Sequence, residues 1–364
     1  MQQKPISNVM MMAAGTGGHV FPALAVAEQL RQQGVQVHWL ATPAGMEHRL
    51  VKPSGIPLYP IDIQGLRGNG VKRLLLAPFK ILKATLAAIR LMRTLKIDAV
   101  AGFGGYVAGP GGLAARILGI PIVIHEQNAV AGMTNTQLAR IATRVLQAFP
   151  DTFAPSPKVQ TTGNPVRQQI CDLPSPAARY MNRTGAFRVL VIGGSLGAQA
   201  LNERVPAALA LLKQPIEVKH QCGQAQLETT RQHYLQAQQQ KTDLTVDVLP
   251  FVEDMAAAYA HADLIICRAG ALTVTEVATV GLPAIFVPLP SAVDDHQTAN
   301  AGYLANAGAA LICAQATLTP ESLATSIGNL LNRQTLLNMA EKSRAKAQPS
   351  ATATVVASIL SVKS

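Results

Sequence analysis

Two glycine-rich segments, one in each half of the chain, have the sequence of a tight turn between a strand and a helix. They are residues 13–19 (AAGTGGH) and 193–198 (GGSLGA), and each follows a short apolar run. Glycine lets the backbone approach a ligand closely, and the free N–H groups at a helix N-terminus favour negative charge. The two turns therefore predict phosphate chemistry in a cleft between two α/β domains.

Neither turn fits a dinucleotide-binding or Walker motif. A G-x-G-x-x-G pattern starting at Gly15 would need a glycine where Val20 stands. The second predicted strand also ends without an acidic residue to hold a ribose, so a dehydrogenase is disfavoured. Taken singly, each turn is equally compatible with an ordinary connection between a strand and a helix.

A third helix start follows an apolar strand at residues 268–276 (RAGALTVTE). The carboxylate of Glu276 could accept hydrogen bonds from both hydroxyls of a ribose. The same spacing fits a capping box, in which Thr273 is the N-cap residue and Glu276 stands three positions later. These residues alone favour the capping box.

The polar residues 294–297 (DDHQ) suggest either a metal site or a helix cap. Adjacent carboxylates on a loop more often cap the next helix, here expected over 297–306, and the chain has no D-x-D triplet. The four cysteines form no C-x-x-C pair. We therefore expect no metal ion and no disulfide, and we expect Gln297 and its neighbours to bind sugar hydroxyls.

Three polar loops of the N-terminal half are predicted to meet at one edge of a sheet. They carry His19, residues 102–106 (GFGGY) and residues 125–128 (HEQN). Ligands of open α/β sheets bind outside the carboxyl ends of the strands, so these loops predict a binding site. Alone, His19 is more typical of a helix start than of a general base.

Residues 71–96 hold seven basic residues, no acidic residue and several leucines. This composition is typical of a helix that lies in an anionic membrane interface, with an ordinary α/β helix that has a basic outer face as the alternative. The residues expected to face the membrane are Lys72, Arg73, Leu75, Phe79, Lys80, Leu82 and Lys83. The net charge of +11 also predicts an acidic partner, and the 4% aromatic content argues against nucleic acid.

The elements that would position these residues alternate between strand and helix, and 364 residues predict two domains. Continuous apolar runs suit parallel strands that are buried on both faces. Strands are expected at 8–13, 35–41, 97–103, 120–125, 143–148, 188–192, 216–220, 244–249, 263–267, 284–287 and 309–313. Helices are expected between them, among others at 21–33, 79–95, 111–118, 134–141, 224–240 and 351–362. A linker is expected at 150–167. No spanning helix or signal peptide is predicted, which favours a cytosolic setting.

Together these segments closely resemble the MurG family of bacterial transferases, which add N-acetylglucosamine to lipid I to make lipid II. The resemblance runs in order along nearly the whole chain, through 15–25 (GTGGHVFPALA), 104–106 (GGY), 125–128, 163–167 (GNPVR), 193–198 and 271–276 (ALTVTE). It implies the GT-B fold, with two Rossmann-like, doubly wound parallel-sheet domains facing across a cleft. Residues 1–163 would form the acceptor- and membrane-facing domain, with a final helix in 347–364 packing back on it, and 164–346 the donor domain.

The resemblance also implies the substrates and the setting. The donor would be UDP-N-acetylglucosamine, and the acceptor would be lipid I, a polyprenyl diphosphate that carries MurNAc-pentapeptide. Transfer to the C4 hydroxyl would proceed with inversion and without a metal cofactor, at the cytoplasmic face of the inner membrane, in peptidoglycan synthesis and hence in cell shape and division. The alternatives are another GT-B glycolipid glycosyltransferase, a UDP-sugar 2-epimerase, or a non-catalytic scaffold with this fold.

Residue by residue, the resemblance implies that Glu276 binds the ribose hydroxyls and that Arg167 and Ser195 meet the diphosphate. The main chain around Phe251 and Val252 would face uracil. Residues expected near the phosphates, sugar or acceptor are Thr16, Gly17, Gly18, Tyr106, Asn128, Ala271, Leu272, Thr273, His296 and Gln297. His296 stands where some relatives carry a second glutamine. An inverting transfer needs a general base, for which His19 is the candidate and Glu126 the alternative.

Overall fold

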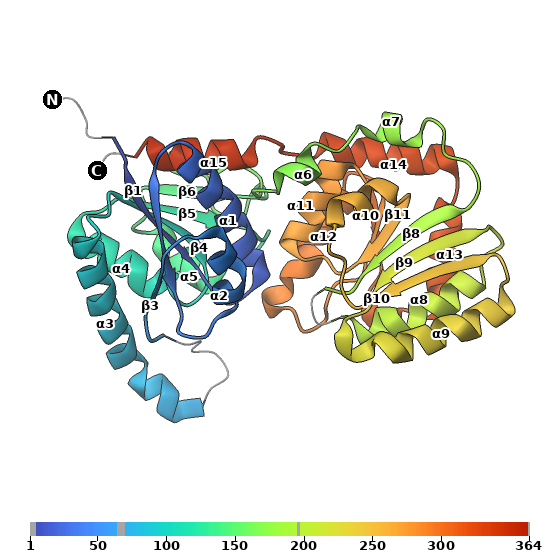
Figure 1. Ribbon diagram of the computed structural model, residues 1–364, viewed down its shortest axis with the longest axis horizontal. Helices are drawn as coiled ribbons and strands as arrows, with labels where there is room; N and C mark the ends of the chain where they lie inside the picture. The colour runs from blue at the N-terminus through green and yellow to red at the C-terminus, as the bar shows by residue number, and fades with distance from the viewer. Residues whose placement is uncertain (1–4, 64–69, 195–196, 363–364) are drawn as a thin grey trace. The chain divides into compact units, whose positions relative to one another are not determined.

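The computed structural model describes residues 5–63, 70–194 and 197–362; the side chains of residues 70–76 and of Val293 are also outside the description (Figure 1). The chain divides into two compact units. Unit 1 comprises Met1–Val166 and Gln348–Ser364, and unit 2 comprises Arg167–Ala347. The sequence placed the boundary between residues 163 and 164.

Unit 1 is built on a parallel sheet of seven strands in the order β3-β2-β1-β4-β5-β6-β7. The strands are β1 (Asn8–Ala13), β2 (Gln36–Ala41), β3 (Leu58–Pro60), β4 (Ala99–Gly104), β5 (Ile122–Glu126), β6 (Arg144–Gln147) and β7 (Val159–Thr161). The helices are α1 (Gly17–Gln32), α2 (Met46–Val51), α3 (Gly70–Thr94), α4 (Ala108–Leu118), α5 (Met133–Ala139) and α15 (Ala351–Leu360).

The core of unit 1 lies on both faces of this sheet. Along β1, Val9 and Met11 pack into one cluster with α1 and α15, whereas Met10 and Met12 pack into another with α3, α4 and α5. Successive side chains of a strand point to opposite faces, so a strand with both faces covered must be apolar at every position. This explains the continuous apolar runs of the sequence.

Unit 2 repeats the architecture with a parallel sheet of six strands in the order β10-β9-β8-β11-β12-β13. The strands are β8 (Phe187–Ile192), β9 (Ile216–Gln221), β10 (Leu244–Leu249), β11 (Leu264–Cys267), β12 (Ala284–Phe286) and β13 (Ala310–Ile312). The helices are α6 (Gln168–Cys171), α7 (Pro176–Tyr180), α8 (Gln199–Ala210), α9 (Leu227–Gln240), α10 (Met255–His261), α11 (Ala271–Val280), α12 (His296–Ala305), α13 (Pro320–Leu330) and α14 (Arg333–Ala345).

A buried carboxylate fixes the amino edge of the second sheet. Asp263, directly before β11, accepts hydrogen bonds from the backbone N–H of Arg188 (2.9 Å) and from Arg333 Nη1 (2.6 Å), and it also pairs with Arg183. A buried carboxylate without such partners would be strongly destabilising. The contacts tie the starts of β8 and β11 to α14, and so hold the two strands whose other ends carry the loops described below.

The parallel α/β architecture predicted for both halves is confirmed, and each predicted strand corresponds to an observed one. Two strands, β3 and β7, and the helices α2, α6, α7, α13 and α14 were not predicted from the sequence. Both missed strands have three residues and lie at the edges of the sheet, where a pattern of apolar residues is weakest. β7 lies inside the predicted linker, so part of that segment belongs to the sheet of unit 1.

In each sheet the order of the strands reverses beside the first strand. β1 lies between β2 and β4, and β8 lies between β9 and β11. Such a reversal leaves a crevice at the carboxyl ends of the strands, where ligands of this fold class bind. Both glycine turns directly follow these central strands. The topology therefore brings each turn to the carboxyl edge at which a ligand site is expected.

Candidate functional site

The first glycine turn fixes the ring of His19. α1 begins at Gly17, with Thr16 as N-cap residue. His19 Nδ1 lies 3.2 Å from the carbonyl oxygen of Ala14 and 3.4 Å from Thr16 Oγ1. A carbonyl oxygen only accepts hydrogen bonds, so the contact with Ala14 requires the proton on Nδ1. In the neutral imidazole the unprotonated, basic nitrogen is then Nε2.

Two glycines at the end of β4 support this turn from the neighbouring strand. Gly104 and Gly105 have φ of +106° and +80°, a region that favours glycine. A Cβ atom on Gly105 would clash with the carbonyl oxygen of Ala14, and one on Gly104 would lie 3.0 Å from His19 Nε2. The loop predicted at 102–106 therefore packs directly against the His19 loop, and Tyr106 beside it is half-exposed.

Glu126, the alternative base, is occupied with holding its own loop. Its side chain is buried. Oε1 accepts hydrogen bonds from the backbone N–H (3.0 Å) and Nδ2 (3.3 Å) of Asn128, and Oε2 accepts them from Gly132 N and Asn135 Nδ2, both at 3.0 Å. These four hydrogen bonds occupy both oxygens of the carboxylate. Its arrangement instead fixes the position of the Asn128 loop.

The neighbouring His125 is also structural. It is buried, its Nε2 donates to the carbonyl oxygen of Gly163 (2.9 Å), and its Nδ1 accepts from Gln127 Nε2 (3.0 Å). Burial lowers the pKa of His125 to about 4, so the ring is neutral near pH 7. His19 is therefore the titratable group of these loops best arranged to accept a proton.

In unit 2, the start of α11 contradicts the capping box. The helix begins at Ala271 with Gly270 as N-cap residue, so Thr273 lies inside the first turn, where it cannot be the cap. The side chain of Glu276 is 12% exposed. Its Oε2 accepts a hydrogen bond from the Tyr259 hydroxyl (2.9 Å), and its Oε1 accepts one from Arg167 Nη2 (3.2 Å). The carboxylate is thus held by side chains of other elements.

Burial and the neighbours of Glu276 affect the pKa of its carboxyl group in opposite directions. Burial raises the pKa of Glu276, and the positive charge of Arg167 and the Tyr259 hydroxyl act against that rise. Arg167 is 43% exposed. The family resemblance implied that Glu276 binds ribose and that Arg167 binds phosphate. In the structure these two side chains are hydrogen-bonded to each other.

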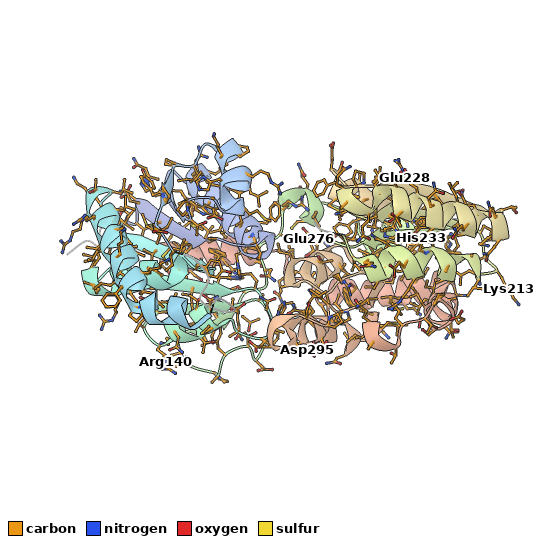
Figure 2. The ribbon with its side chains drawn as sticks, turned by 90° about the horizontal axis from the view of Figure 1, so that it is seen from below. Arg140, Lys213, Glu228, His233, Glu276 and Asp295 are labelled. Atoms are coloured by element: carbon orange, nitrogen blue, oxygen red, sulfur yellow. The ribbon has the colours of Figure 1, made fainter. Side chains whose placement is uncertain are left out.

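Gln297 links two loops at the same edge of the second sheet. Its Oε1 accepts hydrogen bonds from Ala269 N (3.2 Å) and Leu289 N (2.9 Å), which follow β11 and β12. With its oxygen used in this way, the donors that Gln297 can offer a sugar are those of Nε2. Figure 2 shows Glu276 and Asp295, just before Gln297, toward the same end of unit 2.

The prediction that Asp294 and Asp295 both cap the next helix through their carboxylates is wrong. α12 begins at His296, and Asp294 and Asp295 adopt left-handed φ of 53° and 49°. Asp295 stands at the N-cap position but makes no side-chain hydrogen bond to the helix backbone; its Oδ1 accepts from Thr298 Oγ1 (2.7 Å). His296 is partly exposed at the first position of the helix.

The remaining predicted site residues are found as follows. Thr16 and Gly18 are exposed and Gly17 is partly exposed at the start of α1, and Ala271, Leu272 and Thr273 form the first turn of α11. Phe251 is exposed and Val252 is buried in the loop before α10. Ser195 lies outside the described residues. In the second glycine turn, a Cβ atom added at Gly197 would clash with the carbonyl oxygen of Cys222.

Sequence reasoning missed Tyr259, which lies in a short helix and has no motif around it. Its hydroxyl meets Glu276 only because α10 and α11 are packed together, and no spacing along the chain reveals that contact. Among the described residues, no group of three or more His, Cys, Asp or Glu side chains is arranged to hold a metal ion.

Comparisons with known proteins agree with this architecture. The model of the glycosyltransferase family 28 N-terminal domain matches residues 9–147, and that of the glycosyltransferase family 28 C-terminal domain matches residues 188–355. The chain belongs to glycosyltransferase family 28.

Close relatives within family 28 share one name, UDP-N-acetylglucosamine--N-acetylmuramyl-(pentapeptide) pyrophosphoryl-undecaprenol N-acetylglucosamine transferase. The protein from Acinetobacter baylyi is 66% identical over 98% of this chain and 97% of its own length. That from Psychrobacter cryohalolentis is 54% identical over 93% of this chain and 94% of its own.

Solved structures show the same fold. The crystal structure of Acinetobacter baumannii MurG is 62% identical, covers 98% of this chain and 100% of its own, and has a TM-score of 0.88. The glycosyltransferase of kitacinnamycin has a TM-score of 0.71 at 16% identity, with 98% of this chain and 99% of its own covered, and supports the fold alone.

Two alanine variants can test the packing of Gly105 against the first glycine turn. Gly15 also has a positive φ, +95°, but a Cβ there would meet nothing within 4 Å. Gly15→Ala should therefore lower the free energy of unfolding by about 1 kcal/mol through backbone strain alone. Gly105→Ala should lower it by about 3 kcal/mol, because the clash with Ala14 adds to the strain. Urea unfolding midpoints measure both, and equal losses would contradict the described packing.

Proposed function

We propose that this chain transfers N-acetylglucosamine from UDP-N-acetylglucosamine to the C4 hydroxyl of the MurNAc sugar of lipid I, which yields lipid II for peptidoglycan. One observation carries the proposal: a largely buried glutamate, Glu276, is presented beside Arg167 at the carboxyl edge of a parallel sheet. A carboxylate in that place suits the two hydroxyls of a ribose. The names of relatives at 65% identity specify the sugar and the acceptor, and they disfavour a UDP-sugar epimerase or another glycolipid transferase.

On the donor side, the groups available to the diphosphate are main-chain amides and Arg167. The N-terminus of α11 and the turn after β8 both end at the carboxyl edge of the second sheet. Helix N-termini and glycine turns stabilise phosphate through N–H groups. Arg167 is exposed enough to turn from Glu276 toward a phosphate. These groups would stabilise the charge that develops on UDP as it leaves.

On the acceptor side, His19 is our proposed general base. Because Nδ1 donates to Ala14, Nε2 is the nitrogen that accepts a proton. The C4 hydroxyl attacks the anomeric carbon from the side opposite UDP and gives its proton to Nε2. The bond between the anomeric carbon and the β-phosphate oxygen breaks, and its electron pair leaves with UDP. Glu126 serves this site by holding the Asn128 loop in position.

We also propose that unit 1 binds the cytoplasmic membrane surface through α3 and α4. Lys72, Arg73 and Leu75 lie in α3, but their side chains are outside the description. Further along α3, Lys80, Lys83, Phe79, Leu82 and Leu86 are exposed or partly exposed, and α4 packs beside it with Leu113 and Ile117 exposed. Exposed apolar side chains among basic ones suit an anionic interface.

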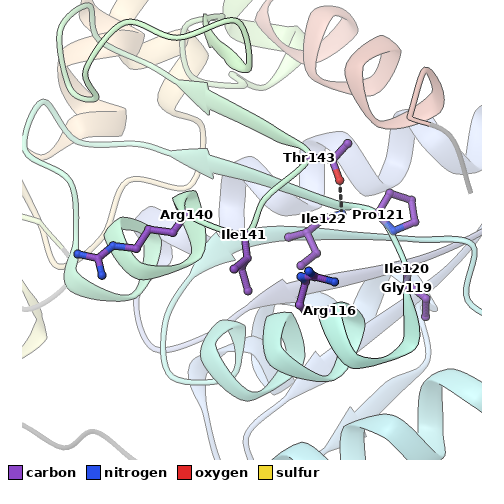
Figure 3. A pocket seen from close by; sticks show the side chains of 8 residues that line it. All are labelled: Arg116, Gly119, Ile120, Pro121, Ile122, Arg140, Ile141 and Thr143. Carbon is purple, nitrogen blue, oxygen red and sulfur yellow. Dashed lines mark hydrogen bonds between the residues drawn. The ribbon is translucent and has the colours of Figure 1, made fainter.

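A pocket at the C-terminal end of α4 carries two further arginines of unit 1. It has a volume of about 390 Å³ and is lined by Arg116 and Arg140 together with Ile120, Ile122 and Ile141 (Figure 3). No acidic side chain lines it. In the part of the chain that the structure describes, no helix is both long and apolar enough to cross a bilayer. The proposed association is therefore peripheral.

Two variants should separate catalysis from donor binding. His19→Ala should lower kcat by about 100-fold or more while UDP affinity stays near wild type, because general-base catalysis contributes on that scale. Glu276→Ala should instead raise the KM for UDP-N-acetylglucosamine, because it removes the ribose acceptor. Steady-state kinetics and UDP titration calorimetry measure both. Equal loss of turnover and UDP affinity in His19→Ala would make His19 a donor-binding residue.

Reversal of the charge on α3 should release the protein from anionic vesicles. Each basic residue near such a surface contributes about 1 kcal/mol, so changing Lys72, Arg73, Lys80 and Lys83 to glutamate should abolish binding in a flotation assay. The matched control reverses four exposed basic residues of unit 2, namely Lys213, Arg231, Lys342 and Lys346. Binding that survives the α3 change and does not respond to salt would refute the interface.

A further inference from the structure

Tyr259 makes a partly buried hydrogen bond to the carboxylate that we assign to ribose. Its side chain comes from α10 and is 1% exposed, and its hydroxyl lies 2.9 Å from Glu276 Oε2. A carboxylate oxygen only accepts, so the phenol is the donor. Burial and the negative charge of Glu276 raise the pKa of Tyr259 well above its ordinary value, so the phenol keeps its proton at any working pH.

The two partners of Glu276 differ in how easily they can move. Tyr259 is enclosed and has few rotamers, whereas Arg167 is 43% exposed on a long side chain. Each carboxylate oxygen can accept two hydrogen bonds. Tyr259 can therefore stay on Oε2 while a ligand hydroxyl binds there too. The contact of Arg167 with Oε1 is the one that can be exchanged.

We propose that Tyr259 is a positioning residue for the donor, which holds the carboxylate of Glu276 in the orientation that receives the ribose hydroxyls while Arg167 is released toward phosphate. The inference rests on the proposed function, because it needs Glu276 to bind ribose. It adds a residue that has no contact with the reacting atoms. Its role is to keep one rotamer of Glu276 populated before the donor arrives.

The location of Tyr259 gives this role a second consequence. α10 begins three residues after Val252, in the loop that we expect to face uracil, and Asp254 caps the helix by accepting from Ala257 N (2.9 Å). One short helix therefore connects the expected uracil loop to the expected ribose carboxylate. Loss of the Tyr259 hydroxyl should weaken recognition of ribose more than it weakens recognition of the base.

The test compares Tyr259→Phe with wild type, with Glu276→Ala and with the control Tyr234→Phe. Tyr234 is another buried tyrosine of unit 2, whose hydroxyl contacts His220 Nδ1 (2.9 Å) and not Glu276. In Tyr259→Phe the KM for UDP-N-acetylglucosamine should rise about tenfold with kcat changed less than about twofold, since a ground-state contact to a charged group is lost. In Tyr234→Phe neither constant should change.

Calorimetry with UDP and 2′-deoxy-UDP measures the preference in binding affinity for the ribonucleotide. A purely structural role of Tyr259 would leave this preference unchanged. Wild type should prefer UDP, and the preference should shrink in Tyr259→Phe and vanish in Glu276→Ala. If Tyr259→Phe keeps the wild-type KM and preference while Glu276→Ala loses both, Tyr259 has no positioning role. If Tyr259→Phe only loses stability, as Tyr234→Phe does, the contact is structural. If Glu276→Ala itself changes neither quantity, the ribose assignment fails and the inference with it.

Discussion

A carboxylate that is almost buried must be charge-paired and hydrogen-bonded, and this constraint organises the proposed donor site of unit 2. Glu276 meets it through Arg167 and Tyr259, which come from different parts of the unit. The pair with Arg167 is partly exposed, so it contributes little to stability. In the proposed function, its value lies in placing a negative group for ribose hydroxyls beside a positive group for phosphates. The contact with Tyr259 supplies the fixed part of this arrangement.

Close backbone packing is the corresponding requirement on the side of unit 1. Neighbouring strands of a parallel sheet bring their carboxyl ends together only as closely as their loops allow. Gly105 lets the end of β4 pack against Ala14, and Ala14 in turn receives the Nδ1 proton of His19. The tautomer of the proposed base thus depends on a backbone contact between two loops. Glu126 fixes the third loop with four hydrogen bonds, so all three are held without a metal-binding cluster among the described residues.

Much of the fold follows from the sequence, because a sheet covered on both faces demands apolar runs, as residues 9–13 of β1 and the whole of β11 display. The short edge strand β3 escaped prediction, since it has three residues and ends in Pro60. The capping box failed for a local reason. Gly270 already provides the extended conformation of an N-cap residue, with φ −62° and ψ 143°, so the helix starts before Thr273. Glu276 therefore lies in the second turn of the helix, where its side chain contacts Arg167 and Tyr259.

Contacts between elements that are remote in sequence could not be predicted from one chain. Nothing in the pattern around Tyr259 indicates that its hydroxyl reaches Glu276, and nothing around Glu126 shows that its carboxylate is filled by Asn128, Gly132 and Asn135. Both contacts bear on the proposed function. The first adds a residue to the proposed donor site, and the second leaves His19 as the proposed general base.

In the proposed reaction Glu276 binds the ribose of the sugar nucleotide, while main-chain amides and Arg167 stabilise the leaving diphosphate without a metal ion. The most direct measurement is turnover of UDP-N-acetylglucosamine with a short-chain lipid I analogue, with and without a strong chelator of divalent cations. The rate should be the same in both, and UDP should be released only when the polyprenyl acceptor is present. Activity that the chelator abolishes and added magnesium or manganese restores would contradict it.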